Sequence, residues 1–354
     1  MSSKHCGVAI KQVPYPIQRG WSVAFVMSPR IGDTLISMVV ANNLARHGVD
    51  VTLYSDHLHD MRNWFPGFRI EPALRPPQAP AELARHDIVL HAYESDVVGD
   101  HPRCWVMDRW PTYRQVKPMV DIQLEICREC LGLPDPLTRE NGLVPPVDAG
   151  GDKVRNRVVI HPTASDRQKQ WLPRRFRELA QVLHGQGYEP CFVVEPNERA
   201  EWAWVEKQGF PLVSYAALDD LARWLTKAGV FVGNDSGIAH LASNLGVPAV
   251  SLAMRPRIAR RWAPGWAPSL AITPPPVMPG RWLRELSWKY LLSVRKVERA
   301  VEALRRRVMN TPLAFGADFA GGPPAPLGRP ANTPASTMLS TITDRLPGPH
   351  QPTP

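Results

Sequence analysis

The sequence lacks any run of about 18 apolar residues, the length that a membrane-spanning helix needs. It also has no long apolar stretch behind its first lysine, so we expect no signal peptide. The five cysteines are few, odd in number and scattered, which argues against a disulfide framework. A reducing cytoplasm is therefore the expected compartment.

Two further absences limit the chemistry. Cys127 and Cys130 form a lone C-x-x-C pair, and no second cysteine pair or nearby histidine pair completes a zinc site. Two thiols on a helix are therefore favoured over a metal or redox centre, and we expect no bound metal. The first strand-to-helix turn has no G-x-G-x-x-G, which argues against a dinucleotide cofactor and hydride transfer.

Positive charge is in excess, with 42 Lys and Arg against 33 Asp and Glu and a net charge of +9. This excess favours anionic partners such as nucleic acid, phosphorylated sugars or an acidic membrane surface. Residues 281–307 carry nine basic and three acidic side chains, so this segment alone supplies +6. Because no nucleic-acid recognition motif accompanies it, we expect no nucleic-acid partner.

Two α/β halves follow each other along the chain. The strand Trp21–Met27, a helix that begins at Asp33 and the strand Val49–Tyr54 form a β-α-β unit with parallel strands. The same alternation restarts after a boundary rich in Pro and Gly near 145–152. We therefore predict an α/β protein with two Rossmann-like, doubly wound domains facing a central cleft. The predicted parts are an irregular lead at 1–20, a first domain at 21–150, a second domain at 151–310 and a tail at 311–354.

Two long helices and the tail complete this prediction. Residues 113–131 have the pattern of one long helix. Residues 281–307 have that of another, with apolar positions spaced alternately by three and four along one face. We expect this apolar stripe to pack across both domains; in the alternative, the basic face holds the protein on an anionic inner membrane surface. Residues 311–354 hold ten prolines in 44 positions, a composition typical of disorder.

The most informative segment is residues 230–252, VFVGNDSGIAHLASNLGVPAVSL. A strand leads through Gly-Asn-Asp-Ser-Gly onto a helix N-terminus, where unpaired amides and the helix dipole favour a phosphate. Gly237 lets the backbone approach a ligand, Ser236 adds a hydroxyl, and His240 lies one turn further on. The structural alternative is that Asp235 or Ser236 is an N-cap and His240 a core histidine. For the run as a whole, we favour the anion site.

Two more loops follow predicted strands, and ligands of open α/β sheets bind beyond the carboxyl ends of the strands. The segment VIHPTASDRQKQWL, residues 159–172, places Lys169 where it can reach a diphosphate. The segment MSPRIGDTL, residues 27–35, places Asp33 at a helix start, where a carboxylate can accept the proton of an attacking sugar hydroxyl. A solvated lysine and a helix cap are the structural alternatives.

Together, the three segments resemble glycosyltransferase family 9, the ADP-heptose:lipopolysaccharide heptosyltransferases. The resemblance covers roughly residues 21–310 and is densest at 229–252. It implies a GT-B fold, with the acceptor in the N-terminal domain and the nucleotide sugar in the C-terminal domain. It also implies an inverting, metal-independent transferase whose co-substrate is ADP-heptose and whose acceptor is a lipopolysaccharide core or a related glycan. The nucleotide sugar and a glycolipid or glycan are thus the expected partners.

The resemblance further implies a role for individual residues. Asp33 is expected to be the general base, in an acceptor-side loop that includes Arg30, Gly32 and Thr34. The residues expected to bind the donor are Thr163, Lys169, Glu198, Asp235, Ser236, Gly237 and His240.

The loop at residues 253–257 departs from the family pattern. It reads Ala-Met-Arg-Pro-Arg where the family has a loop similar to Tyr-Gly-Pro-Thr/Ser-x-Pro. Because this loop lies near the base or the sugar of the donor, two alternatives stay open. One is a GT-B transferase that uses another nucleotide sugar or a protein acceptor. The other is a non-catalytic, nucleotide-binding scaffold, against which the presence of Asp33 argues.

Overall fold

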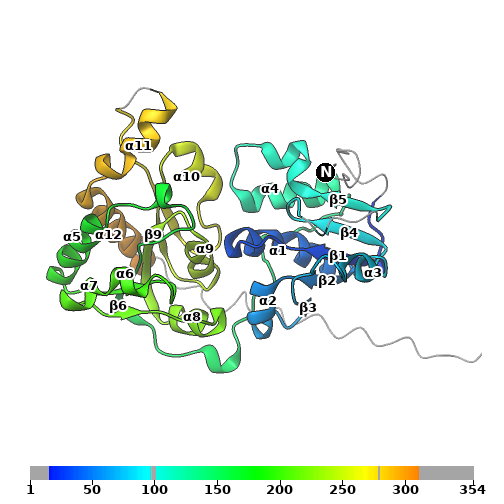
Figure 1. Ribbon diagram of the computed structural model, residues 1–354, viewed down its shortest axis with the longest axis horizontal. Helices are drawn as coiled ribbons and strands as arrows, with labels where there is room; N and C mark the ends of the chain where they lie inside the picture. Colours follow the sequence, from blue (N-terminus) through cyan, green and yellow to red (C-terminus); the bar gives the residue numbers. More distant parts are fainter. Residues whose placement is uncertain (1–15, 96, 98–100, 278–279, 311–354) are drawn as a thin grey trace, which may run out of the picture. The chain divides into compact units, whose positions relative to one another are not determined.

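The computed structural model describes residues 16–95, 97, 101–277 and 280–310. These residues form two sheets, and every strand pair in them is parallel. Helices accompany both sheets, so the predicted α/β class is confirmed (Figure 1). The predicted tail and most of the predicted lead lie outside the described residues, and the predicted domain boundaries stay predictions.

The first sheet has the strand order β3-β2-β1-β4-β5. Its strands are β1 (Ser22–Val26), β2 (Asp50–Tyr54), β3 (Arg69–Glu71), β4 (Ile88–His91) and β5 (Cys104–Val106). Successive strand residues point to opposite faces. In β1, Val23 and Phe25 join one buried apolar cluster, and Ala24 and Val26 join another. Burial on both faces explains why these strands read as continuous apolar runs.

The helices of the first half divide between these two faces. Leu35 of α1 and Ile122 of α4 join the cluster of Val23, whereas Leu83 of α3 joins that of Ala24. The helical segments are α1 (Ile31–Arg46), α2 (Asp56–Asp60), η1 (Arg62–Trp64), α3 (Ala79–Leu83), η2 (Met107–Arg109), η3 (Pro111–Arg114), α4 (Met119–Glu125) and η4 (Ile126–Cys130).

The second sheet has the strand order β11-β10-β9-β6-β7-β8. Its strands are β6 (Val154–His161), β7 (Glu189–Val193), β8 (Leu212–Val213), β9 (Ala228–Asn234), β10 (Ala249–Leu252) and β11 (Ser269–Ile272). The central strands β9 and β6 end side by side, with His161 opposite Gly233. The loops that follow both strands therefore begin at one point on the carboxyl edge of the sheet.

The second half carries the remaining helices. Phe176 of α5 and Val301 of α12 pack in one cluster, and Ala222 of α8 and Ala239 of α9 pack in the cluster that also contains α1. These segments are η5 (Val147–Ala149), η6 (Arg167–Lys169), α5 (Pro173–Gly185), α6 (Arg199–Trp202), α7 (Trp204–Lys207), α8 (Leu218–Leu225), α9 (Gly237–Asn244), α10 (Pro256–Trp262), α11 (Arg281–Leu291) and α12 (Val294–Asn310).

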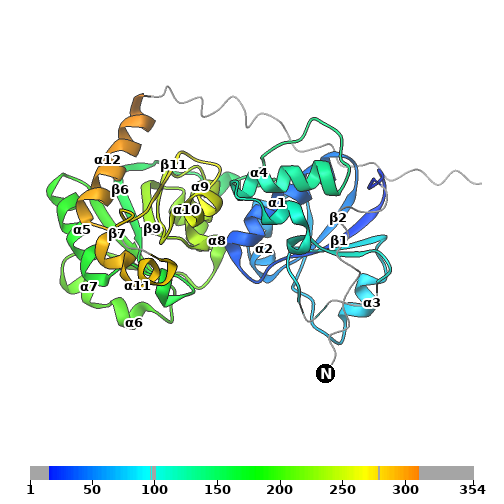
Figure 2. The ribbon, with the colours of Figure 1, turned by 90° about the horizontal axis from the view of Figure 1, so that it is seen from above.

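The helices α1 and α9 join the two halves. They lie side by side in both views (Figure 1, Figure 2) and are in contact. Their apolar side chains belong to one continuous buried cluster that runs from the first sheet to the second. The position of the two helix starts relative to each other is therefore fixed by core packing.

The prediction of one helix over residues 113–131 is wrong. The chain instead forms η3, an extended connection, and then α4 from Met119 and a π-helical turn over Ile126–Cys130. Pro118 immediately precedes α4, and proline favours such a helix start because it lacks an amide hydrogen. Cys127 and Cys130 are fully buried free thiols, whereas Cys104 is disulfide-bonded.

The prediction of one helix over residues 281–307 is also wrong. The chain breaks between α11 and α12, where Leu292 is extended and its carbonyl accepts a hydrogen bond from Trp171 Nε1 at 3.2 Å. The predicted apolar stripe divides at this break. Its second part, with Val297 and Leu304, is buried against the second sheet, whereas Leu283 and Leu286 of α11 are exposed. Each helix in the described residues is too short or too polar to span a bilayer.

Candidate functional site

Two helix N-termini meet at the centre of the molecule. α1 follows β1 and α9 follows β9, so each helix begins at the carboxyl edge of its own sheet. A Cβ atom built on Gly237 would lie 2.9 Å from the backbone nitrogen of Gly32, and one built on Gly32 would lie 3.0 Å from Cδ2 of His240. Only glycine allows this approach, which brings the predicted loop of Asp33 to the predicted anion site.

Asn234 holds the two loops of the second half together. This side chain is fully buried. Its Nδ2 donates a hydrogen bond to the carbonyl of Pro162 at 2.7 Å, and its Oδ1 accepts one from the backbone nitrogen of Trp171 at 2.9 Å. The loop that carries Lys169 is thereby fixed beside the Gly-Asn-Asp-Ser-Gly turn. The sequence motif contained this residue without revealing its positioning role.

Lys169 and Asp235 form an ion pair in this structure, with Nζ 3.2 Å from Oδ2. The lysine side chain is 33% exposed and the aspartate side chain 12%. η6, which carries Lys169, is capped by Asp166, and the carbonyl of Gln168 accepts a hydrogen bond from Trp288 Nε1 at 2.9 Å. The amine therefore lies on a supported loop and keeps access to solvent.

Two polar atoms at the start of α9 are buried without a hydrogen-bond partner, Ser236 Oγ and His240 Nδ1. Ser236 occupies the N-cap position, yet its side chain makes no capping hydrogen bond. Buried polar groups are normally satisfied, so these two atoms at a helix N-terminus are available to hydrogen-bond a ligand. Burial lowers the pKa of His240 to about 4, which keeps the imidazole neutral at neutral pH.

Asp33 lies in the first turn of α1 and is partly buried. Burial raises the pKa of its carboxyl group, while a hydrogen bond from Tyr93 and the charges of Arg30 and Lys169 act in the opposite direction. The charge of Asp235 raises this pKa further. Asp33 is therefore within electrostatic range of the Lys169–Asp235 pair.

The other predicted residues support the loops or lie further away. Thr34 is fully buried and its hydroxyl donates to the carbonyl of Ser28 at 2.8 Å, so it shapes the turn before α1. Arg30 is exposed at the start of α1. Thr163 is buried beside Asn234. Glu198 immediately precedes α6, and its carboxylate accepts a hydrogen bond within its own loop, from the backbone nitrogen of Glu195 at 3.1 Å.

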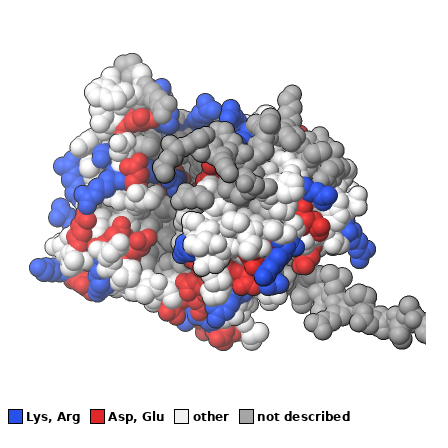
Figure 3. Space-filling view, turned by 45° about the vertical axis from the view of Figure 1, so that its right-hand side comes forward, with Lys and Arg blue, Asp and Glu red and all other residues white. Residues whose placement is uncertain are grey.

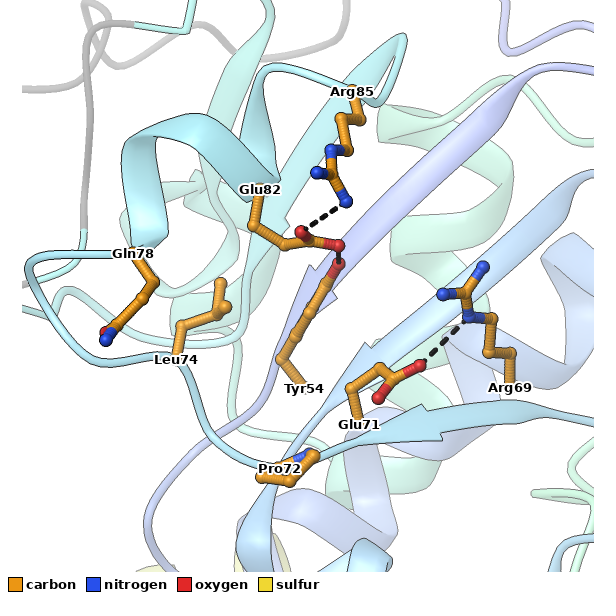
Figure 4. Close-up of a pocket in the computed structure, with 8 residues that line it drawn as sticks. All are labelled: Tyr54, Arg69, Glu71, Pro72, Leu74, Gln78, Glu82 and Arg85. Carbon is orange, nitrogen blue, oxygen red and sulfur yellow. Dashed lines mark hydrogen bonds and ion pairs between the residues drawn. The ribbon is translucent and has the colours of Figure 1, made fainter.

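A hollow in the first half lies apart from this site (Figure 4). The charged groups that line it neutralise one another: Arg85 pairs with Glu82 at 2.9 Å, and Arg69 pairs with Glu71 at 3.0 Å. The hydroxyl of Tyr54 donates to Glu82 at 3.1 Å. Because these charges already have partners, the hollow presents no excess of one sign to a ligand. Across the described ranges, no three or more His, Cys, Asp or Glu side chains gather as a metal site would require.

Comparison with known proteins relates part of the chain to one enzyme family. Residues 97–265 match the model of glycosyltransferase family 9 (heptosyltransferase). A 106-residue stretch is 32% identical to lipopolysaccharide heptosyltransferase 3 of Escherichia coli and covers 28% of this chain and 31% of that protein. The chain thus matches less than a third of the length of this relative. The region matched by the family model contains Lys169, Asp235 and His240, and Asp33 precedes it.

Solved structures share the fold over a much longer stretch. A glycosyl transferase of family 9 from Veillonella parvula superposes with a TM-score of 0.65 at 15% identity, covering 82% of this chain and 98% of that one. The ADP-heptose lps heptosyltransferase II of E. coli superposes with a TM-score of 0.62 at 15% identity, covering 81% and 99%. The predicted GT-B fold is confirmed by these neighbours and by the two parallel sheets.

Proposed function

We propose that this chain belongs to glycosyltransferase family 9 and transfers heptose from ADP-heptose to a hydroxyl of a lipopolysaccharide core or a related glycan. One observation carries the proposal: the packing of α1 on α9 brings Asp33 within electrostatic range of Lys169 and Asp235. A carboxylate that accepts a proton thus faces a helix end suited to a diphosphate, as an attack on a nucleotide sugar requires.

The donor diphosphate binds at the start of α9. The unpartnered Ser236 Oγ and His240 Nδ1 become hydrogen-bond donors to its oxygens, together with the free amides of the first turn. Lys169 turns from Asp235 towards the diphosphate, which offers it more negative charge than one carboxylate does. Because His240 is neutral before the donor binds, we assign it a hydrogen-bonding role rather than that of a fixed positive charge.

Asp33 is the general base. Its carboxylate takes the proton from an acceptor hydroxyl while that oxygen forms a bond to the anomeric carbon. The bond from the anomeric carbon to the diphosphate breaks in the same displacement, and its electron pair leaves with the nucleoside diphosphate. Attack from the side opposite the leaving group inverts the anomeric centre. The raised pKa of Asp33 strengthens it as a base but requires a pH at which it is ionised.

The protein itself stabilises the charge that develops on the leaving diphosphate. The amides of α9 and His240 are held in place by the fold and Lys169 joins them when the donor binds, so the groups are in position before the reaction, which makes electrostatic stabilisation effective. We therefore expect transfer without a divalent cation or other cofactor, and undiminished rates in the presence of EDTA test this expectation.

We further propose that the protein works at the cytoplasmic face of an anionic membrane and docks through α11. Trp282, Leu283, Leu286 and Tyr290 of this helix are 69%, 42%, 52% and 57% exposed. Exposed basic side chains accompany them on α10 and α11, including Arg257, Arg260 and Arg284. Figure 3 shows a largely uncharged lobe at the upper left, with both acidic and basic atoms beside it. Aromatic and aliphatic side chains next to basic ones are typical of a helix that lies in a lipid interface.

The choice of donor is tested by the thermal shift of the purified protein with ADP, UDP, GDP and CMP. A ligand that binds only the folded state stabilises it by about 2.7 kcal/mol at 100 times its Kd. We expect ADP to give the largest shift. A shift with UDP or GDP instead would keep the transferase and change its donor, which the altered loop at 253–257 permits. No shift with any nucleotide would favour the non-catalytic scaffold.

A further inference from the structure

Two tyrosines extend from Asp33 along the carboxyl edge of the first sheet. β1, β4 and β5 are adjacent strands, and Asp33, Tyr93 and Tyr113 follow them in the same order. The hydroxyls of Tyr93 and Tyr113 are hydrogen-bonded, and their rings meet edge to face with centroids 5.9 Å apart. The hydroxyl of Tyr93 also lies near enough to the carboxylate of Asp33 to lower the pKa of that group. The three side chains thus lie in one row.

The direction of the hydrogen bonds in this row follows from the chemistry of its members. An ionised carboxylate has no proton to give, so the hydroxyl of Tyr93 donates to Asp33. A hydroxyl carries only one proton, so the oxygen of Tyr93 must accept the proton of Tyr113. Burial raises the pKa of Tyr113 to about 12 and that of Tyr93 further, so both hydroxyls keep their protons at neutral pH.

Arg261 of α10 holds the far end of the row from the second half. Its guanidinium donates hydrogen bonds to the carbonyls of Tyr113 and Gln115, each at 2.5 Å. The same group lies over the ring of Tyr113, 5.2 Å from its centroid. Two hydrogen bonds and a cation–π contact from one planar group fix both the backbone and the ring of Tyr113. α10 begins within residues 253–257, the segment that the family resemblance places near the donor.

We propose that Tyr93 and Tyr113 are positioning residues that orient the carboxylate of Asp33 for proton transfer, and that Arg261 anchors them from the donor-binding half. This inference rests on the proposed function, because it gives Asp33 the role of base. It adds a link between the halves, because the orientation of the Asp33 carboxylate in the first half depends on the contact that Arg261 makes from the second half. Nothing in the sequence motifs marks Tyr93, Tyr113 or Arg261 for this role.

The test uses Tyr93→Phe and Tyr113→Phe, with transfer measured from ADP-heptose to heptose-deficient lipopolysaccharide. A hydrogen bond to a charged group contributes enough that its loss lowers kcat by about 10- to 100-fold. We expect this loss in Tyr93→Phe, with the KM values of both substrates within about twofold of wild type, because Tyr93 contacts neither substrate in the proposal. Tyr113→Phe is expected to give a smaller loss of the same kind.

The pH profile separates positioning from a structural effect. A hydrogen bond to the ionised form lowers the pKa of a carboxyl group, so its removal in Tyr93→Phe raises that pKa. The acid limb of the rate profile is therefore expected to move to higher pH. The matched control is Tyr215→Phe, a partly buried tyrosine that packs on Trp224 in the second half. We expect Tyr215→Phe to leave both kcat and the acid limb of the pH–rate profile unchanged.

Combination with Asp33→Asn completes the test. If Tyr93 acts through Asp33, then Tyr93→Phe causes no further loss in the Asp33→Asn background. An unchanged kcat and acid limb in Tyr93→Phe, with Asp33→Asn slowed by at least about 100-fold, would overturn this inference and leave the proposed function intact. A multiplicative loss in the double variant would also overturn it. An Asp33→Asn protein that is as active as the wild type would instead exclude Asp33 as the general base.

Discussion

Gly32 and Gly237 touch across the boundary between the two halves: a Cβ atom on Gly32 would lie 3.1 Å from the Cα atom of Gly237. Each glycine stands in the first turn of its own helix. A side chain at either position would separate the two helix starts. The approach of the proposed base to the proposed diphosphate site therefore depends on the absence of two side chains.

Gly237→Ala should damage both stability and activity. Its Cβ atom would lie 2.3 Å from Ile31 Cγ2 and 2.9 Å from the backbone nitrogen of Gly32, and the backbone atom cannot move cheaply. Overpacking of this kind costs about 1–3 kcal/mol of unfolding free energy. Urea denaturation measures this cost. Gly185→Ala is the matched control, since no atom lies within 4 Å of its added Cβ. Equal stabilities of the two variants would show that the helix starts are not in close contact.

Lys169→Met should weaken ADP binding and keep the fold. The substitution retains the aliphatic stem and removes the charge that we assign to the diphosphate. The loss of a charged hydrogen bond is expected to raise the Kd for ADP by about 10- to 100-fold, as isothermal titration calorimetry can measure. Arg167→Ala is the control, because Arg167 lies on the same short helix with its side chain 85% exposed. An unchanged Kd in Lys169→Met would place the diphosphate elsewhere.

Acidification should destabilise the protein in part through His240. Burial lowers the pKa of this histidine from 6.5 to about 4, so between these values the unfolded chain binds a proton that the folded protein does not. The stability from this group is therefore complete above pH 6.5 and is lost as the pH falls towards 4, by up to about 3 kcal/mol.

His240→Gln removes this titration. Its unfolding free energy, measured by denaturation between pH 7 and pH 4.5, should fall less steeply than that of the wild type. His91 and His161 are also buried with lowered pKa values and titrate equally in both proteins, so the difference between the two slopes isolates His240. Parallel slopes would show that His240 is not buried as a neutral imidazole.

Docking through α11 predicts binding to anionic vesicles. The full-length protein should float with vesicles that contain phosphatidylglycerol, less so at high salt, and not with phosphatidylcholine alone. Leu286→Ser should reduce this binding, because it removes an exposed apolar side chain that would enter the lipid interface. Val182→Ser on α5 serves as control, since Val182 is similarly exposed at 41%. Equal flotation of the two variants would contradict docking through α11, as would self-association that Leu286→Ser abolishes without any vesicle binding.

Local patterns predicted the β-α-β units well because each such unit is specified by neighbouring residues. The strand at 22–26, the helix at 31–46 and the strand at 50–54 follow directly from an apolar run, a helical pattern and Gly48, whose φ of +78° suits a helix end. The turn at 233–237 was found for the same reason. Its sequence alone describes a strand, a tight turn and a helix start.

The break at Leu292 could not be predicted from the apolar periodicity. Periodicity shows that a helix has an apolar face, but it does not show what that face contacts. Here the indole of Trp171, more than a hundred residues earlier in the sequence, donates a hydrogen bond to the carbonyl of Leu292. Ser293 is a local signal of the second helix start, because its hydroxyl accepts a hydrogen bond from the backbone nitrogen of Lys296 and so caps α12.

The tyrosine row was missed for a related reason. Tyr93 lies two residues beyond the end of β4, where the rule for carboxyl ends of parallel strands could have drawn attention to it. Tyr113 and Arg261 are 148 residues apart in sequence and are brought together only by the packing of the two halves. No local pattern encodes such a contact.

The central claim is that Asp33 accepts the proton of the acceptor hydroxyl in a transfer from ADP-heptose. The most direct test is the single-turnover rate of heptose transfer to heptose-deficient lipopolysaccharide by the wild-type protein and by Asp33→Asn, with folding checked by circular dichroism. We predict transfer by the wild type and a rate lower by at least about 100-fold in Asp33→Asn, since general base catalysis contributes about 100- to 10,000-fold. A folded Asp33→Asn protein that transfers heptose at nearly the wild-type rate would contradict the account.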